Sequence, residues 1–142
     1  MRVAVVFFTE KSREKLINIS KSLAEGIKSQ GHQVDLIDGD RDVNTRLTIY
    51  KYIAVGTEAV TSIGGKIPEK VAVFLSAAGV VSGKRCFAFI LKKFFGSTKA
   101  LFRLMKGMEK EGMFLKYSEI IQSDVEAEEI GKRLQVAQPE GV

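Results

Sequence analysis

Near the start of the chain, the apolar run Val3-Ala4-Val5-Val6-Phe7-Phe8 leads directly into the polar turn Thr9-Glu10-Lys11-Ser12-Arg13-Glu14. A continuous β-branched and aromatic run is typical of a strand buried on both faces of a parallel sheet. An amphipathic helical pattern follows the turn. The first N–H groups of a helix have no internal partner and attract anions, so the turn is a candidate phosphate site. The alternative, which the turn alone favours, is that Thr9 or Ser12 only caps the helix.

The rest of the chain alternates between strand patterns and helix patterns. In the first helix, Leu16, Ile19, Leu23 and Ile27 recur on one face. We expect strands at residues 3–8, 33–37, 51–55 and 85–91, and a fifth within 113–122. We expect helices over residues 12–30, from Pro68 onward, from a cap at Ser97 or Thr98, and after the capping-box sequence 123–126, with a weakly helical connection over 42–48.

Five strands that alternate with helices predict a three-layer α/β sandwich around a five-stranded parallel sheet. The size and strand count fit the flavodoxin-like order 2-1-3-4-5, in which ligands bind outside the carboxyl ends of the strands. Residues 9–14, 57–65 and 92–97 would meet at that edge. We expect residues 1–136 to form this single domain and residues 137–142 to form a C-terminal tail.

Local motifs in these loops give the chain a resemblance to the flavodoxin family over nearly its whole length. The sequence has Gly56-Thr57 after the third strand, then Gly64-Gly65-Lys66-Ile67-Pro68 and Phe74-Leu75. This is similar to the family's Gly-Ser/Thr turn, glycine-ended loop and proline-started helix. Glu14-Lys15-Leu16 likewise looks like the start of the family's first helix. The resemblance implies an FMN cofactor and oxidoreductase activity, with one-electron or hydride transfer through the flavin.

The resemblance also implies which residues form the site. The first loop would wrap the FMN phosphate, and the other two loops would hold the isoalloxazine ring. No side chain is needed as a catalytic acid or base, because the flavin carries the chemistry. The phosphate ligands would be Thr9, Lys11, Ser12 and Arg13, and the residues flanking the ring would be Thr57, Glu58, Ala59, Val60, Thr61, Phe94, Phe95 and Gly96.

The chain departs from the family pattern in two of these loops. The family's phosphate loop reads Ser/Thr-x-Thr-Gly-Asn-Thr, whereas here Lys11 stands near the glycine and Arg13 near the last threonine. Without glycine, backbone donors close less easily around a phosphate. Residues 57–63 offer no aromatic ring to stack on a flavin. These departures support an alternative function, a flavodoxin-like module without flavin that acts through protein contacts.

Composition and charge limit the partners. Of the 142 residues, 45% are hydrophobic and 27% charged, which is ordinary for a soluble globular protein. No apolar run is long enough to span a membrane and the sequence starts directly with a strand pattern, so we expect a cytoplasmic protein. Of the net charge of +5, residues 84–116 contribute nine Lys and Arg against two Glu, so an acidic partner or polyanion is a further hypothesis. No nucleic-acid motif is present, and we expect no nucleic-acid binding. We expect a redox partner protein or small-molecule acceptor. The third helix is unusually apolar over residues 71–81, so it is either well covered within the fold or the interface of a homodimer.

Isolated reactive side chains suggest little further chemistry. Cys86 lies in an apolar run, which favours core packing over thiol chemistry. The chain has one histidine, His32, and one cysteine, too few of these ligands for a typical zinc site. The acidic residues Asp38, Asp40 and Asp42 crowd one turn, where they either hold a hard cation or are simply solvated, and solvation is the more common case.

Overall fold

Five parallel strands form one sheet in the computed structural model, which describes residues 1–137. The strand order is β2-β1-β3-β4-β5, so the predicted order 2-1-3-4-5 is confirmed. The inner strands are almost entirely buried, as their continuous apolar sequences indicate. The strands are β1 (Arg2–Phe7), β2 (Gln33–Asp38), β3 (Tyr52–Thr57), β4 (Arg85–Leu91) and β5 (Phe114–Ile121).

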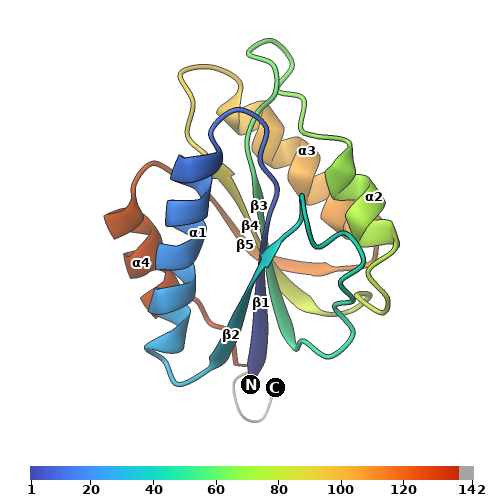
Figure 1. Cartoon of the computed structure of the whole chain (residues 1–142), viewed down its shortest axis with the longest axis vertical. Helices are drawn as coiled ribbons and strands as arrows, with labels where there is room; N and C mark the ends of the chain where they lie inside the picture. Colours follow the sequence, from blue (N-terminus) through green and yellow to red (C-terminus); the bar gives the residue numbers. More distant parts are fainter. Residues whose placement is uncertain (138–142) are drawn as a thin grey trace.

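Helices cover both faces of this sheet and complete the three layers (Figure 1). Helices α1 (Arg13–Lys28) and α4 (Asp124–Arg133) lie on one face, and α2 (Lys70–Ser76) and α3 (Ser97–Lys110) lie on the other. Each face has its own apolar core. The two cores confirm the predicted α/β sandwich.

Local sequence signals account for the positions of these helices. The predicted inward face of α1 is fully buried at Leu16, Ile19, Leu23 and Ile27. At the start of α4, Ser123 Oγ accepts a 3.2 Å hydrogen bond from the Glu126 N–H, as the capping-box sequence predicts. The apolar spacing and the cap therefore placed both helices of this layer correctly.

Two glycines let α1 and α4 approach each other closely. A Cβ atom on Gly26 would stand 2.2 Å from the Glu128 carbonyl oxygen, and one on Gly131 would stand 2.4 Å from the Leu23 carbonyl oxygen. Contacts this short are incompatible with any side chain, so the crossing depends on glycine at both positions.

The structure corrects several local predictions. Residues 42–48 form turns and no helix. Strand β3 continues to Thr57 instead of ending at Val55, because Gly56 and Thr57 stay paired with the neighbouring strands. Position 56 needs glycine, since the Phe89 ring fills the space where a Cβ would lie. No side-chain cap forms at Ser12, and Gly96 rather than Ser97 or Thr98 precedes α3, with a φ of 85°.

The apolar third helix is shorter than its sequence pattern. Helix α2 spans Lys70–Ser76 and buries Val71, Phe74 and Leu75 against the sheet. Val73 and Val80 are exposed by 66% and 61%. Most of the apolar surface is therefore used by the core, and the homodimer stays a prediction.

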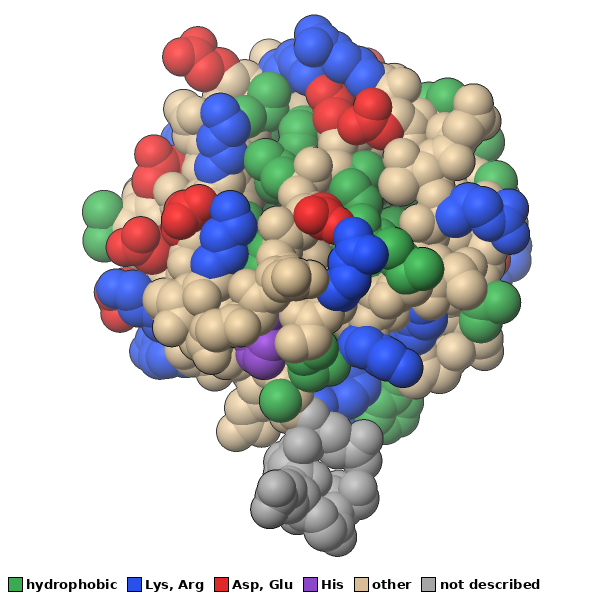
Figure 2. All heavy atoms as spheres, turned by 60° about the horizontal axis from the view of Figure 1, so that its bottom comes forward, with side chains coloured by type: hydrophobic (Ala, Val, Ile, Leu, Met, Phe, Trp, Pro, Cys, Tyr) green, Lys and Arg blue, Asp and Glu red, His purple; other side chains and the backbone are tan. Residues whose placement is uncertain are grey.

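The surface at the amino ends of the strands carries acidic and basic side chains intermixed (Figure 2). No helix within residues 1–137 is long and apolar enough to cross a membrane. Apart from Ala137, the predicted tail over residues 137–142 lies outside the described residues.

Candidate functional site

Three loops gather at the carboxyl ends of β1, β3 and β4, at the top of Figure 1. We call residues 8–12, 58–69 and 92–96 the loop edge. Backbone contacts join the first loop to β3, since the Phe8 N–H donates to Gly56 O at 3.0 Å. The Thr57 hydroxyl in turn donates to Phe8 O at 2.8 Å. The predicted meeting of the loops after β1 and β3 is therefore confirmed.

Glycines bring the second and third loops into backbone contact. Gly65 has a φ of 57°, and a Cβ there would stand 2.5 Å from the Gly96 carbonyl oxygen. Gly96 has a φ of 85°, and a Cβ there would stand 2.8 Å from the Thr61 carbonyl oxygen. Both positions need glycine for conformation and for space.

The turn after β1 holds an anion that the chain supplies itself. We call residues 9–13 the anion turn. The Glu58 carboxylate accepts hydrogen bonds at 3.0 Å from the Glu10 N–H, at 3.2 Å from the Lys11 N–H, and at 3.0 and 3.2 Å from the Ser12 N–H. Glu58 is fully buried. N–H groups at the start of a helix have no partner within the helix and bind anions. Here the anion is a side chain of this chain, from the loop that follows β3, the neighbour of β1 in the sheet.

Lys93, in the loop after β4, completes the shell around this carboxylate. Its ammonium lies 2.8 Å from Glu58 Oε1 and 3.0 Å from the Ser12 hydroxyl oxygen. Burial alone would raise the pKa of Glu58. The hydrogen bonds from Lys93 and from the turn's N–H groups outweigh burial and lower the pKa of Glu58 below its ordinary value. Glu58 is therefore a buried, ionised and fully paired group.

A second acidic residue, Asp40, neutralises the other side of the anion turn. It accepts hydrogen bonds from the Thr9 N–H at 3.1 Å and from the Thr9 hydroxyl at 2.5 Å. Arg13 pairs with Asp40 at 2.9 Å and also with Asp38, and Lys70 pairs with Asp40 at 2.7 Å. The turn with Asp38 and Asp40, for which a bound cation was one of two predictions, is thus paired with the side chains of Arg13 and Lys70. Within residues 1–137 there is no group of acids, histidines and cysteines suited to a metal ion.

Each predicted phosphate ligand can now be placed. Thr9 and Arg13 contact the carboxylate of Asp40. The N–H groups of Lys11 and Ser12 contact Glu58. The structure therefore brings all four predicted residues together, and the backbone N–H groups of Lys11 and Ser12 and the side-chain donors of Thr9 and Arg13 face carboxylates of this chain.

The residues predicted to flank a ring divide into buried and exposed groups. Thr57, Glu58 and Ala59 are buried, and Val60 and Thr61 are half-buried. In the third loop Gly96 is half-buried. The rings of Phe94 and Phe95 pack edge to face, with centroids 4.7 Å apart, and are exposed by 92% and 63%.

A cavity of about 570 Å³ lies beside these rings. It is lined by residues 62–64 of the second loop, residues 92–99, and Ile120. The exposed rings therefore border a hollow surface. The anion turn also borders one, of about 650 Å³, but its N–H groups face the Glu58 carboxylate.

Sequence reasoning missed the residues that close the anion turn. Lys93 and Lys70 were given no role, and Glu58 was assigned to the ring and not to the turn. The sequence did contain a signal for this ion pair: two neighbouring buried strands are each followed by a charged residue. Glu58 comes directly after β3, and Lys93 comes two residues after β4. Carboxyl ends of neighbouring parallel strands lie at one edge, so opposite charges there are candidates for an ion pair.

Comparison with known structures identifies the fold. The chain resembles oxidised flavodoxin 1 from Bacillus cereus, with a TM-score of 0.70 and 17% identity over 94% of this chain and 99% of that chain. It resembles a flavodoxin from the domain Archaea, with a TM-score of 0.65 and 15% identity over 93% of this chain and 94% of that chain. No protein-family model and no curated protein sequence matches the chain. The chain therefore has the flavodoxin-like fold.

The residues of the anion turn, as arranged, do not fit the phosphate of FMN. The N–H groups that a phosphate would use already bind Glu58, and the Thr9 and Arg13 donors already bind Asp40. A phosphate placed there would face two carboxylates, and like charges at short range repel. The fold is that of a flavodoxin, but the turn is satisfied internally.

Proposed function

We propose that this chain is a flavodoxin-like module that acts through protein contacts at its loop edge and does not hold FMN phosphate in the anion turn. The observation that supports this proposal is the buried Glu58 carboxylate, which takes the three N–H groups of the turn and the Lys93 ammonium. This was the alternative that the departures from the flavodoxin pattern favoured.

Energetics support a permanently closed turn. For a phosphate to enter, Glu58 must leave its site and lose all of these hydrogen bonds together. Hydrogen bonds to a charged group each contribute about 1.5–3 kcal/mol to stability. Lys93 would also be left without its buried partner, a change that typically costs about 3–5 kcal/mol. A phosphate gains nothing in the turn that the carboxylate does not already have.

The neighbouring surface supports protein contacts. Ile63, Phe94 and Phe95, which we call the aromatic tip, are exposed by 89%, 92% and 63%. Large apolar side chains gathered on one exposed surface are typical of interaction sites, and aromatic residues often dominate their binding energy. The exposed basic residues Lys92 and Lys99 lie on either side of Phe94 and Phe95 in the sequence. The aromatic tip with its basic surroundings suits an acidic protein partner.

A visible absorption spectrum of the purified protein tests the absence of flavin. The spectrum is recorded before and after incubation with FMN and removal of the excess by gel filtration. We expect no retained flavin band from the wild-type protein. A band retained at one equivalent would overturn the proposal.

Affinity capture with a matched variant tests the contact surface. A protein that binds the wild-type chain should be lost with the double variant Phe94→Ser/Phe95→Ser. The control is Phe114→Ser, since Phe114 is exposed by 56% but begins β5 at the opposite end of the sheet. A partner that binds both variants equally would exclude the aromatic tip as the contact surface.

A second candidate function is FMN-dependent electron transfer to or from a redox protein or a small-molecule acceptor. It is favoured by the likeness to flavodoxins and by the 570 Å³ cavity beside Phe94 and Phe95. Bound FMN would supply one-electron or hydride chemistry. This candidate requires Glu58 to leave the anion turn. A retained flavin band in the same spectrum would support its flavin-binding part, and reduction and reoxidation of that flavin by a redox partner would test its electron transfer.

A further inference from the structure

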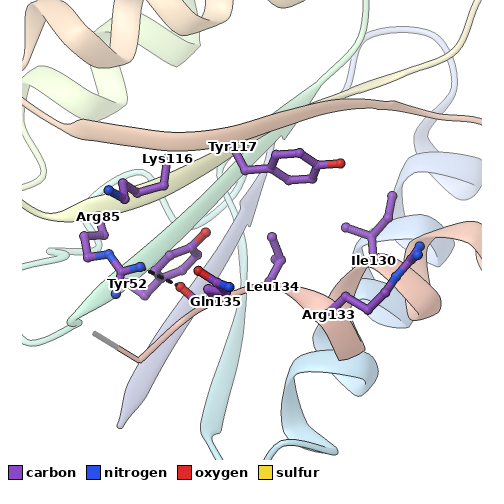
Figure 3. Close-up of a pocket in the computed structure, with 8 residues that line it drawn as sticks. All are labelled: Tyr52, Arg85, Lys116, Tyr117, Ile130, Arg133, Leu134 and Gln135. Carbon is purple, nitrogen blue, oxygen red and sulfur yellow. Dashed lines mark hydrogen bonds between the residues drawn. The ribbon is translucent and has the colours of Figure 1, made fainter. Parts of the chain in front are cut away.

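A separate cavity of about 350 Å³ lies far from the loop edge, near the amino ends of β3, β4 and β5 (Figure 3). The start of the sheet forms one wall, and the last turn of α4 with the segment that follows it forms the other. This volume is within the range of small-molecule sites, about 300–1,000 Å³. The lining residues are Tyr52, Arg85, Lys116, Tyr117, Ile130, Arg133, Leu134 and Gln135.

A β-bulge places two consecutive residues on the same cavity wall. Side chains alternate between the faces of a regular strand, so neighbours do not line one site. Here the pairing of β4 with β5 shifts by one residue, from Cys86 opposite Leu115 to Phe87 opposite Tyr117. Lys116 is the extra residue, and both Lys116 and Tyr117 line the cavity. Bulges that re-aim side chains are common beside functional sites.

The hydroxyl of a buried tyrosine opens into the cavity. Tyr52 is 1% exposed, and no hydrogen bond within residues 1–137 engages its hydroxyl. Figure 3 shows this hydroxyl directed into the space between Lys116 and Leu134. The hydroxyl is not one of the fully buried polar atoms that lack a partner, so it is accessible from the cavity and available to a polar group of a ligand or to a water molecule.

The charged groups around the cavity are mostly positive. Arg85, Lys116 and Arg133 line it, no Asp or Glu lines it, and none of the three forms an ion pair within residues 1–137. Arg85 also has a structural task, because its guanidinium donates to the carbonyl oxygens of Gln135 and Val136 and so holds the outer wall. Beside the cavity, Glu119 accepts a 2.6 Å hydrogen bond from the Tyr117 hydroxyl.

We propose that this cavity binds a small organic anion with an apolar or aromatic body. The Lys116 ammonium lies over the Phe114 ring, 4.7 Å from its centroid, and the exposed, flexible side chain turns from there to supply the positive charge for the anionic group. The Tyr52 hydroxyl donates a hydrogen bond to the same group. The apolar body packs against Leu134, Ile130 and the ring of Tyr117. That ring is fixed in position by stacking on Phe87, with centroids 5.6 Å apart. Arg133, on the other side of the cavity, favours a second polar group on the ligand.

Fluorescence titration with anilinonaphthalene sulfonate, an aromatic anion, tests this proposal. We expect one equivalent to bind. Lys116→Gln should weaken binding about tenfold, as loss of about 1.4 kcal/mol requires. Tyr52→Phe should weaken it about threefold to tenfold, as loss of one hydrogen bond requires. The matched control is Lys106→Gln, an exposed lysine of α3, which should leave the affinity unchanged.

Two further measurements separate this site from nonspecific dye binding. The neutral analogue N-phenyl-naphthylamine should bind at least about tenfold more weakly than the sulfonate. The double variant Phe94→Ser/Phe95→Ser should bind the dye like the wild-type protein, because the aromatic tip lies at the other end of the sheet. Equal binding of sulfonate and neutral analogue, equal binding by Lys116→Gln and wild type, or loss of binding in the tip variant would each overturn the proposal. Lys116 is exposed, so its variant remains informative even if Tyr52→Phe fails to fold.

Discussion

The anion turn and the aromatic tip are neighbours at one sheet edge, yet the anion turn encloses a buried charged side chain and the aromatic tip exposes apolar ones. Glu58, the first residue after β3, is fully buried and bound by five hydrogen bonds. Phe94, the third residue after β4, is 92% exposed. The polar side chain is inside and the apolar one is outside. The difference teaches that this flavodoxin-like fold satisfies its anion-binding turn internally and leaves the next loop available for contacts.

Glu58→Gln is expected to have the largest effect, because it tests whether the anion turn is a structural unit. The amide keeps the shape but removes the charge and turns an NH₂ group toward the donors of the anion turn. Leaving Lys93 and these donors unpaired should lower the free energy of unfolding by about 3 kcal/mol. Urea denaturation measures this change.

The control for this experiment is Glu10→Gln, an exposed residue of the same turn, which should change stability by less than about 0.5 kcal/mol. The double variant Glu58→Gln/Lys93→Met should cost less than the sum of its single changes, because the two residues share one interaction. Additive losses would mean that the pair is not coupled and that the anion turn is not a closed unit.

Gly65→Ala tests the backbone contact that holds the second loop against the third. Alanine at a positive φ costs about 1 kcal/mol, and the overlap of its Cβ with Gly96 O should add about 2 kcal/mol. Gly83→Ala is the matched control, since Gly83 has a φ of 77° and nothing lies within 4 Å of an added Cβ. Thermal or urea unfolding should therefore separate the two variants, and equal losses would show that the loops do not depend on this contact.

The pH dependence of stability sharpens the comparison, because only the anion turn carries a buried ionised group. The pKa of Glu58 is lower in the folded protein than its ordinary value. Its stabilising contribution is therefore complete above the unfolded pKa of about 4.3 and is lost as the pH falls through the folded pKa. We expect the melting temperature to fall below about pH 5 in the wild-type protein and to fall less steeply in Glu58→Gln. Parallel curves for the two proteins would contradict this assignment.

Periodic apolar residues predicted the elements and their buried faces, because they report which surface of each element is buried. The strand order and the three loops that meet followed from the fit of size and strand count to the flavodoxin-like order. Lys11, Ser12 and Arg13 were recognised as an anion turn, since its place between a strand and a helix is local information. The identity of the anion was not local. Glu58 lies 46 residues beyond Ser12, and Lys93 lies 35 residues beyond Glu58. Such a contact becomes visible only when the sheet brings the loops together.

Phe94→Ser is expected to have the smallest effect on stability and the most selective effect on binding. An exposed ring that buries little area contributes little to folding, so the free energy of unfolding should change by less than about 0.5 kcal/mol. A central aromatic contact in a protein interface typically contributes about 2 kcal/mol or more to binding, so affinity for a captured partner should fall at least about thirtyfold. Urea denaturation and a binding titration on the same variant measure both quantities. A variant that is destabilised as much as Glu58→Gln would show that Phe94 supports the fold, and the contrast between a closed anion turn and an available aromatic tip would then fail.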